Sequence, residues 1–152
     1  MVRIPLEYSR LRQTGEVAIF PRLELLVRAS IGNFAALEFL LDTGANFTTI
    51  PLAEARRLQL AVPPRTITLE VRTAAGMVRQ QVHPGRISVQ VPGLQGHTFT
   101  WPCHFVDTPG QAAPVALLGL SGVLNDLRLT FDGTYALDAR YGVLLLEQRA
   151  NP

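Results

Sequence analysis

The chain has 152 residues, 47% of them hydrophobic, and a formal net charge of +2 at pH 7. These values indicate a single domain, residues 1–152, with enough apolar side chains for a proper core. All the basic residues are Arg and none is Lys, which excludes Schiff-base chemistry and the lysine of a phosphate-binding P-loop.

Three further features restrict the partners and the setting. The Arg residues are scattered along the chain, so a nucleic-acid-binding surface is not indicated. Cys103 is the single cysteine, so no internal disulfide can form. No apolar stretch approaches the roughly 18 residues of a membrane span, and the N-terminal segment lacks a signal-peptide pattern. We therefore expect a soluble, cytoplasmic protein with no membrane partner.

The first part of the chain predicts short strands joined by tight turns. Every second residue from 2 to 6 is apolar, which suits a strand, although a loosely ordered tail is the alternative. Residues 23–28 predict a further strand, and residues 31–33 favour a hairpin turn into a strand over residues 37–41.

This last strand ends at the string Leu40-Leu41-Asp42-Thr43-Gly44-Ala45. Gly44 permits a tight backbone turn, so an acid is carried to the end of an apolar strand and presented on a loop. A β-branched run over residues 46–50 predicts the returning strand. A carboxylate in such a place costs free energy unless it is hydrogen-bonded or paired, which indicates a functional role for Asp42.

The middle of the chain predicts a short helix and a long hairpin. Residues 51–58 have helical periodicity, with a proline at the first turn. Alternating residues 66–72 and 77–82 predict two strands joined by a turn at residues 73–76, and residues 87–91 predict a separate strand.

The last third predicts more short strands. Residues 99–106 form a strand whose Pro102 favours a sheet edge or a bulge, and residues 109–114 form a loop. A core strand over residues 115–118 precedes a short helix over residues 120–127. The remaining predicted strands are residues 128–131, 135–137 and 142–147. Many short strands with frequent turns predict an all-β barrel with two short helices.

Two motifs resemble those of a known family. The string from Leu40 to Ala45 resembles the active-site loop of aspartic proteases, and in so short a chain it resembles the retropepsin-like branch. The second motif, Ala116-Leu117-Leu118-Gly119 followed by a predicted helix, resembles that family's second signature. The resemblance covers residues 23–146 and implies a closed acid-protease barrel with a flap hairpin. The wealth of Arg, Ala, Pro and Gly without Lys suggests a bacterial member.

The resemblance also implies roles for individual residues. Asp42 is expected to act as the acid and base, Thr43 to hydrogen-bond across a dimer axis, and Gly44 to allow the turn and contact the substrate backbone. Other expected substrate-binding residues are Ala45 and Asn46 on the loop, and Ala74, Ala75, Gly76 and Met77 at the flap tip. Support from behind the loop is expected from Leu117, Leu118 and Gly119. Neither a cofactor nor a metal is expected.

Peptide hydrolysis of this kind needs two carboxylates that share a proton, one activating water and the other protonating the departing group. The chain has one convincing Asp-Thr-Gly, so the expected enzyme is a C2-symmetric homodimer that pairs two copies of Asp42 and cleaves a protein or peptide substrate. In the family, terminal strands join the subunits, which implies that role for residues 2–8 and for the C-terminal strand. Viral members often have an ion pair between the positions occupied here by Asn46 and Leu120, so dimer strength must come from other contacts.

Other chemistry-bearing residues favour structural interpretations. Asp107-Thr108-Pro109 has proline where the catalytic turn needs glycine, so a second catalytic loop is not expected. Cys103 and His104 are strand neighbours and point to opposite faces, which does not make a dyad. The three histidines lack paired metal-ligand spacing.

Two alternatives to the enzyme stay open at this level. One is a non-catalytic peptide-binding or dimerisation module on the same fold, although such a module has no need for Asp42. The other places Asp42 in a turn of an unrelated β-barrel. Likewise, the hairpin over residues 66–82 is either a flap or an ordinary surface hairpin.

Overall fold

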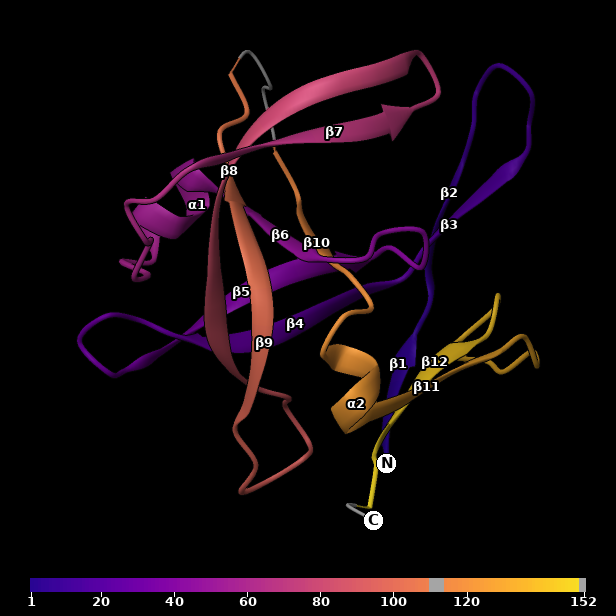
Figure 1. Cartoon of the computed structure of the whole chain (residues 1–152). Coiled ribbons are helices and arrows are strands. Elements are labelled where there is room, and N and C mark those ends of the chain that lie inside the picture. The colour runs from indigo at the N-terminus through magenta and orange to yellow at the C-terminus, as the bar shows by residue number, and fades with distance from the viewer. Residues whose placement is uncertain (110–113, 151–152) are drawn as a thin grey trace.

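The computed structural model of the protein describes residues 1–109 and 114–150 (Figure 1). It is all-β with two short helices, which confirms the predicted fold class. In chain order the elements are β1 (Val2–Pro5), β2 (Glu7–Arg10), β3 (Val17–Phe20), β4 (Arg22–Arg28), β5 (Phe34–Leu41), β6 (Thr48–Pro51), α1 (Leu52–Arg57), β7 (Ile67–Thr73), β8 (Gly76–Gln90), β9 (Phe99–Val106), β10 (Ala116–Leu118), α2 (Val123–Asp126), β11 (Leu127–Asp132) and β12 (Val143–Gln148).

The main sheet closes into a barrel. Its described strands have the order β4-β5-β10-β6-β9-β8-β7, and β4 also pairs with β8 through Leu26 and Val27. This extra pairing joins the two ends of the ring and leaves β7 outside it. The closed barrel expected from the resemblance is therefore present.

Strand β10 separates β5 from β6, although the chain passes directly from one to the other. Leu117 pairs with Leu40 of β5 in a parallel ladder and with Thr49 of β6 in an antiparallel one. The loop that joins β5 to β6 must therefore pass over the end of β10. This topology brings the two sequence motifs together.

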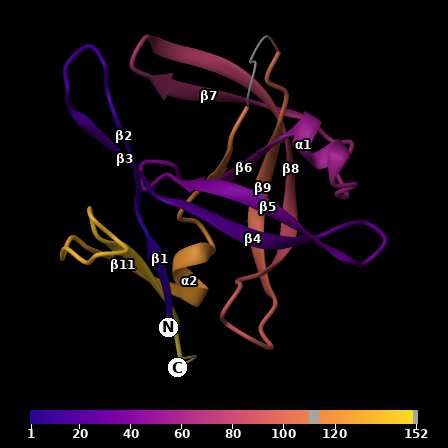
Figure 2. The ribbon, with the colours of Figure 1, turned by 180° about the vertical axis from the view of Figure 1, so that it is seen from behind.

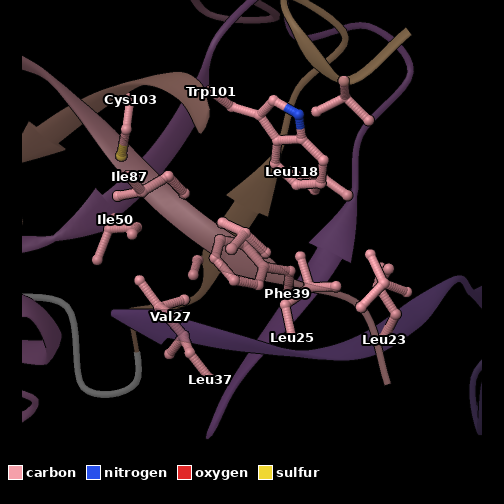
Figure 3. Packing of buried hydrophobic residues seen from close by; sticks show 14 of the residues in the cluster. Leu23, Leu25, Val27, Leu37, Phe39, Ile50, Ile87, Trp101, Cys103 and Leu118 are labelled. Carbon is pink, nitrogen blue, oxygen red and sulfur yellow. The ribbon is translucent and has the colours of Figure 1, made fainter. Parts of the chain in front are cut away.

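Alternation along the strands fills the barrel interior. In β4, Leu23, Leu25 and Val27 are buried while Glu24 and Arg28 are exposed. Figure 3 shows the buried side chains gathered between the strands. Full burial of one such side chain contributes about 1.5–3 kcal/mol, so this set provides the main stabilisation of the fold.

A smaller sheet with the order β1-β12-β11 lies beside the barrel. Val2 pairs with Leu146, and Leu129 pairs with Leu146 from the other side. The start of the chain is thus a strand and not a loose tail. The terminal strands β1 and β12 pair with each other inside one chain. The resemblance implied that the terminal strands pair with those of a second subunit instead.

Trp101 connects the barrel to the segment that leads into the smaller sheet. Its fully buried indole Nε1–H donates a hydrogen bond of 2.8 Å to Asp126 Oδ2 at the end of α2. Buried indole N–H groups require such a partner. This bond fixes the direction in which β11 leaves the barrel.

Several predicted boundaries are wrong for identifiable reasons. Residues 135–137 are not a strand and have only an isolated bridge between Ala136 and Ala139. The separate strand predicted at residues 87–91 belongs to the long β8, which pairs with β7, then β9, then β4. Of the loop predicted at residues 109–114, residues 110–113 lie outside the described residues.

Three more elements differ from the expectation. The second helix covers only Val123–Asp126, and the hairpin of β2 and β3 was not predicted. Strand β9 lies between β8 and β6 and not at an edge. Pro102 lies opposite Arg86 of β8, whereas the pairing of β9 with β6 begins only at the next residue, Cys103. The N–H that proline lacks is therefore not needed in the β6–β9 ladder. Among the described residues, no helix is long and apolar enough to cross a membrane.

Candidate active site

Asp42 follows directly from β5 and is attached to the end of β10. Its backbone N–H donates to the carbonyl oxygen of Leu118 at 3.0 Å, which extends the β5–β10 ladder by one residue. The first motif therefore rests on the second, as the sequence suggests. Leu118 is fully buried, so this attachment is anchored in the core.

The Asp42 carboxylate is half-buried and accepts a hydrogen bond from the backbone of its own loop. Gly44 N–H donates to Asp42 Oδ1 at 3.0 Å, and Ala45 N–H donates to the Asp42 carbonyl oxygen at 3.1 Å. Donation by a backbone N–H to an ionised carboxylate stabilises the charged form and orients it. The acid is thus held in one orientation before any ligand binds.

Gly44 contributes to the loop in a different way from the one expected. Gly44 is absent from the glycines with positive φ among the described residues, so the turn itself does not require glycine here. Instead, a Cβ added at Gly44 would lie 3.3 Å from Asp42 Oδ1. The missing side chain lets the backbone approach the carboxylate and donate to it.

The far side of the loop is fixed by backbone bonds from the segment after β10. Leu120 N–H donates to the Ala45 carbonyl oxygen at 3.1 Å, and Ser121 N–H donates to the Asn46 carbonyl oxygen at 2.7 Å. The two segments include Asn46 and Leu120, where the resemblance described above leads one to look for an ion pair. In this chain, main-chain hydrogen bonds connect the same two segments without any charge.

Gly119 lies directly under the returning chain. A Cβ there would lie 2.5 Å from the Phe47 carbonyl oxygen and 2.8 Å from the Thr48 nitrogen. Gly119 N–H donates to Thr48 Oγ1 at 3.2 Å, and Thr48 is completely buried. The loop and its support are therefore in backbone-to-backbone contact, with one buried hydroxyl satisfying the N–H between them.

An aromatic stack covers the end of the loop. The Phe47 ring lies 4.4 Å from the His104 ring, with 29° between the planes, and Thr49 pairs with His104 across β6 and β9. Partial burial lowers the pKa of His104 below its usual value. A neutral imidazole is therefore the form that packs against Phe47.

The flap-tip residues lie at the far end of the β7–β8 hairpin. Ala74 and Ala75 make the turn, Gly76 begins β8, and Met77 pairs with Arg72. All four tip residues named from the sequence are exposed. In Figures 1 and 2 the hairpin extends towards the side of the molecule where the loop between β5 and β6 lies.

A hollow of about 480 Å³ lies between this hairpin and the segment after β9. Val71 and Val78, which face each other across the hairpin, line it together with Asp107 and Pro109. Both valines are exposed, and apolar side chains left open beside a hollow are typical of a ligand-binding surface.

The other candidate groups have structural surroundings. Asp107 is exposed and follows β9 without a supporting ladder like that of Asp42. Cys103 is buried, and burial raises the pKa of its thiol far above the usual value, so the nucleophilic thiolate is disfavoured. Within the described residues, no group of three or more His, Cys, Asp or Glu side chains could hold a metal ion.

The sequence did not predict roles for Phe47 and Thr48, nor the packing of the His104 ring against Phe47 at the end of the loop. Thr48 looks like one more β-branched strand residue, and its buried partner is 71 positions away along the chain. The His104 ring contacts a residue of another strand. No local pattern encodes such contacts, since they depend on strand order.

Comparisons with known proteins agree with this arrangement. A family model described as "gag-polyprotein putative aspartyl protease" matches residues 27–124. The crystal structure of a retropepsin-like aspartic protease from Rickettsia conorii is similar, with a TM-score of 0.54 and 18% sequence identity over 98% of this chain and 92% of that one. EIAV protease complexed with the inhibitor HBY-793 matches with a TM-score of 0.44 and 22% identity, over 66% of this chain and 81% of that one. A search of curated protein sequences finds no match.

Proposed function

The protein belongs to the retropepsin-like, gag-polyprotein aspartyl protease family, and on that basis we propose that it is an aspartic endopeptidase active as a homodimer. The match covers the loop that carries Asp42 (residues 42–47, the acid loop), the β7–β8 hairpin and the motif around Gly119. The family membership follows from the match; the peptidase activity, the homodimer and the catalytic role of Asp42 are proposed.

The orientation of the Asp42 carboxylate is the observation that carries it. Gly44 N–H donates to its Oδ1 at 3.0 Å, and its own N–H is attached to Leu118. A carboxylate that served only to cap a turn would have no need of a loop fixed on both sides. Catalysis does need it, because a small displacement of a reacting group lowers the rate greatly.

The reaction requires two such groups. One Asp42 carboxylate accepts a proton from water as that water attacks the peptide carbonyl carbon, and the protonated Asp42 of the partner subunit donates to the carbonyl oxygen. The C–N bond then breaks as the nitrogen receives a proton, and the pair returns to one shared proton. The apparent pKa values of such a pair belong to both groups together.

The substrate is a protein or peptide bound in extended form. The exposed valines of the β7–β8 hairpin offer an apolar surface, and the hollow of about 480 Å³ beside them can receive a side chain. An extended backbone can hydrogen-bond to a hairpin edge while alternate side chains enter pockets. The small residues Ala74, Ala75 and Gly76 allow the tip to approach that backbone closely.

The test is cleavage of an unstructured protein between pH 3 and pH 7, over a series of enzyme dilutions. Asp42→Asn should abolish cleavage, while Asp107→Asn, the matched control in the other Asp-Thr sequence, should retain it. Wild-type activity should fall more steeply than linearly on dilution, because the dimer dissociates. Equal activity of wild type and Asp42→Asn would contradict the proposal. Absence of cleavage by a protein shown to be dimeric would also contradict it, and would favour the peptide-binding module.

A further inference from the structure

The sheet formed by β1, β12 and β11 has two free edges in the described chain, and they differ in character. The β1 edge is four residues long and contains Pro5, which has no N–H to donate. The β11 edge is six residues long, Leu127–Asp132, and contains no proline. Short strands and prolines are the usual protection of a sheet edge, and β11 has neither.

The backbone groups that face this free edge follow from the ladder with β12. Arg149 N–H donates to the Asp126 carbonyl oxygen at 2.8 Å, one step beyond the Leu127–Gln148 pair. In an antiparallel ladder the bonding direction alternates with each residue. The N–H and C=O groups of Leu129 and Phe131 therefore point outwards, away from β12.

The side chains at this edge are apolar and poorly covered. Phe131 pairs with Leu144 and Leu129 pairs with Leu146, so these four side chains share the face that packs against the core. Leu144 and Leu146 are fully buried, whereas Phe131 is 48% exposed. The core-facing surface of the sheet thus continues to its edge, where about half of Phe131 remains exposed.

The sequence of β11, Leu-Arg-Leu-Thr-Phe-Asp, is complementary to itself in antiparallel pairing. With Thr130 opposite Thr130 of the partner subunit, Arg128 faces Asp132 of the partner subunit and Leu129 faces Phe131 of the partner subunit. Opposite charges and apolar pairs stabilise such cross-strand contacts. We propose that β11 is the dimerisation strand: two copies join edge to edge through β11, with the two-fold axis at Thr130.

This register also satisfies the outward backbone groups. Leu129 and Phe131 of each copy become hydrogen-bonded pairs, and Thr130 becomes a pair without backbone hydrogen bonds, with a Cα–Cα distance of about 4.5 Å. The two sheets merge into one continuous sheet with the same face towards the cores. Phe131 is then covered by the second copy.

The charged side chains are available for the pairing. Arg128 is 74% exposed and has only a 4.0 Å contact with Glu147. Asp132 accepts hydrogen bonds from the backbone N–H of Thr134 at 2.9 Å and from the Thr134 side chain, and it is only partly buried, so an arginine of the second copy can approach it from the edge. Arg3 lies on the same face and is paired with Asp138 at 2.6 Å; its positive charge near Asp132 weakens the pairing with a second arginine but does not occupy the Asp132 carboxylate.

The inference rests on the proposed function, because an aspartic protease with one Asp42 per chain is incomplete without a second copy. It departs from the family expectation in the strand that it names, since β1 and β12 pair with each other here. In Figures 1 and 2, the sheet and the loop between β5 and β6 lie on the same side of the molecule, which a shared two-fold axis requires.

Cross-linking tests the register directly. Cα atoms at about 4.5 Å are within the range for a disulfide, and the natural Cys103 is buried, so Thr130→Cys adds the one accessible thiol of the described residues. Thr130→Cys should form a covalent dimer under mild oxidation and should resist dilution. Thr68→Cys, at an exposed threonine on the edge strand β7, is the matched control and should stay monomeric in reducing-agent-free gels.

Charge reversal provides a second test that does not depend on thiol chemistry. Arg128→Asp should shift the monomer–dimer equilibrium towards monomer by about tenfold or more, because two like-charge contacts replace two ion pairs. The double variant Arg128→Asp with Asp132→Arg should restore dimerisation. Both are measured by analytical ultracentrifugation.

The outcomes separate the two proposals. A dimer that is active and depends on Asp42, but that neither cross-links at Thr130→Cys nor weakens with Arg128→Asp, would overturn the β11 register and leave the protease intact. A dimer that cross-links at Thr130→Cys but never cleaves would support β11 and overturn the catalytic function. A protein that is monomeric at every concentration would overturn the β11 proposal.

Discussion

The loop that carries Asp42 and the β7–β8 hairpin lie on the same side of the molecule but are built in opposite ways. The loop at residues 42–47 is fixed by hydrogen bonds to Leu118, Leu120 and Ser121 and rests on buried side chains. The tip of the β7–β8 hairpin is exposed and extends beyond the point at which β8 begins to pair with β9.

This difference separates two tasks. In the proposed enzyme, Asp42 is a reacting group that must stay in place, which agrees with the buried contacts around its loop. The proposed flap must open to admit a substrate, and a hairpin with few buried apolar contacts opens at low free energy. Substitutions in the support of the loop should therefore affect folding and activity together, whereas those in the β7–β8 hairpin should affect mainly substrate binding.

The largest expected effect is at Gly119. In Gly119→Ala, the added methyl group would meet the backbone of Phe47 and Thr48, which cannot move without displacing the acid loop. We expect a loss of about 3 kcal/mol in the free energy of unfolding, measured by urea denaturation, together with loss of cleavage. Gly133→Ala is the control, because nothing lies within 4 Å of its Cβ position. Equal stability of the two variants would contradict the close contact.

Thr48→Val should have the next largest effect. It removes the acceptor of the Gly119 N–H and leaves that buried donor unsatisfied, at an expected cost of about 1–3 kcal/mol. Thr68→Val, on an exposed strand position, should change stability by less than about 0.5 kcal/mol. If Thr48→Val proved as stable as wild type, the hydroxyl would not be what connects β6 to the second motif.

Substitutions of exposed residues in the β7–β8 hairpin should leave the free energy of unfolding almost unchanged. Val71→Ser and Val78→Ser alter exposed side chains, so each should shift the free energy of unfolding by less than about 0.5 kcal/mol. Loss of apolar surface beside the hollow should raise KM several-fold with a smaller change in kcat, as steady-state kinetics would show. A fall in kcat at constant KM would assign these valines to the reaction step instead.

The smallest expected effect is a pH dependence at His104. Burial lowers the pKa of His104 in the folded state, so below about pH 6.5 the unfolded chain binds a proton that the folded chain does not. Stability is therefore lost as pH falls from that value towards the folded pKa. His104→Phe, which keeps the aromatic stack, should flatten this part of the thermal-stability curve. An unchanged slope would exclude His104 as its source.

The sequence was sufficient for features that depend on local pattern. Strand patterns identified β4, β5 and the β7–β8 hairpin, and the string around Asp42 predicted a loop directly after β5. The second motif at Gly119 was also found, because an apolar pair before glycine is visible without knowing the fold. These features follow from residue types and their spacing along the chain.

The remaining features depend on contacts between distant segments. The strand predicted at residues 135–137 has the right residue types but no ladder partner beyond one bridge. Pro102 fits inside β9 only because β6 begins its pairing one residue later. The hydrogen bond from Gly119 to Thr48 depends on the strand order, and the role of Gly44 depends on how closely its backbone approaches the Asp42 carboxylate. The alternation of apolar and polar residues encodes neither.

Subunit mixing tests whether catalysis needs one Asp42 from each of two copies. Wild-type enzyme is held at a fixed concentration, and increasing amounts of Asp42→Asn are added and allowed to exchange subunits before cleavage is measured. If each site is shared by two copies, activity should fall towards zero as wild-type chains enter mixed dimers, while added Asp107→Asn should not reduce it. Activity that stays constant in a large excess of Asp42→Asn, with mixed dimers shown to form, would contradict a shared pair of carboxylates.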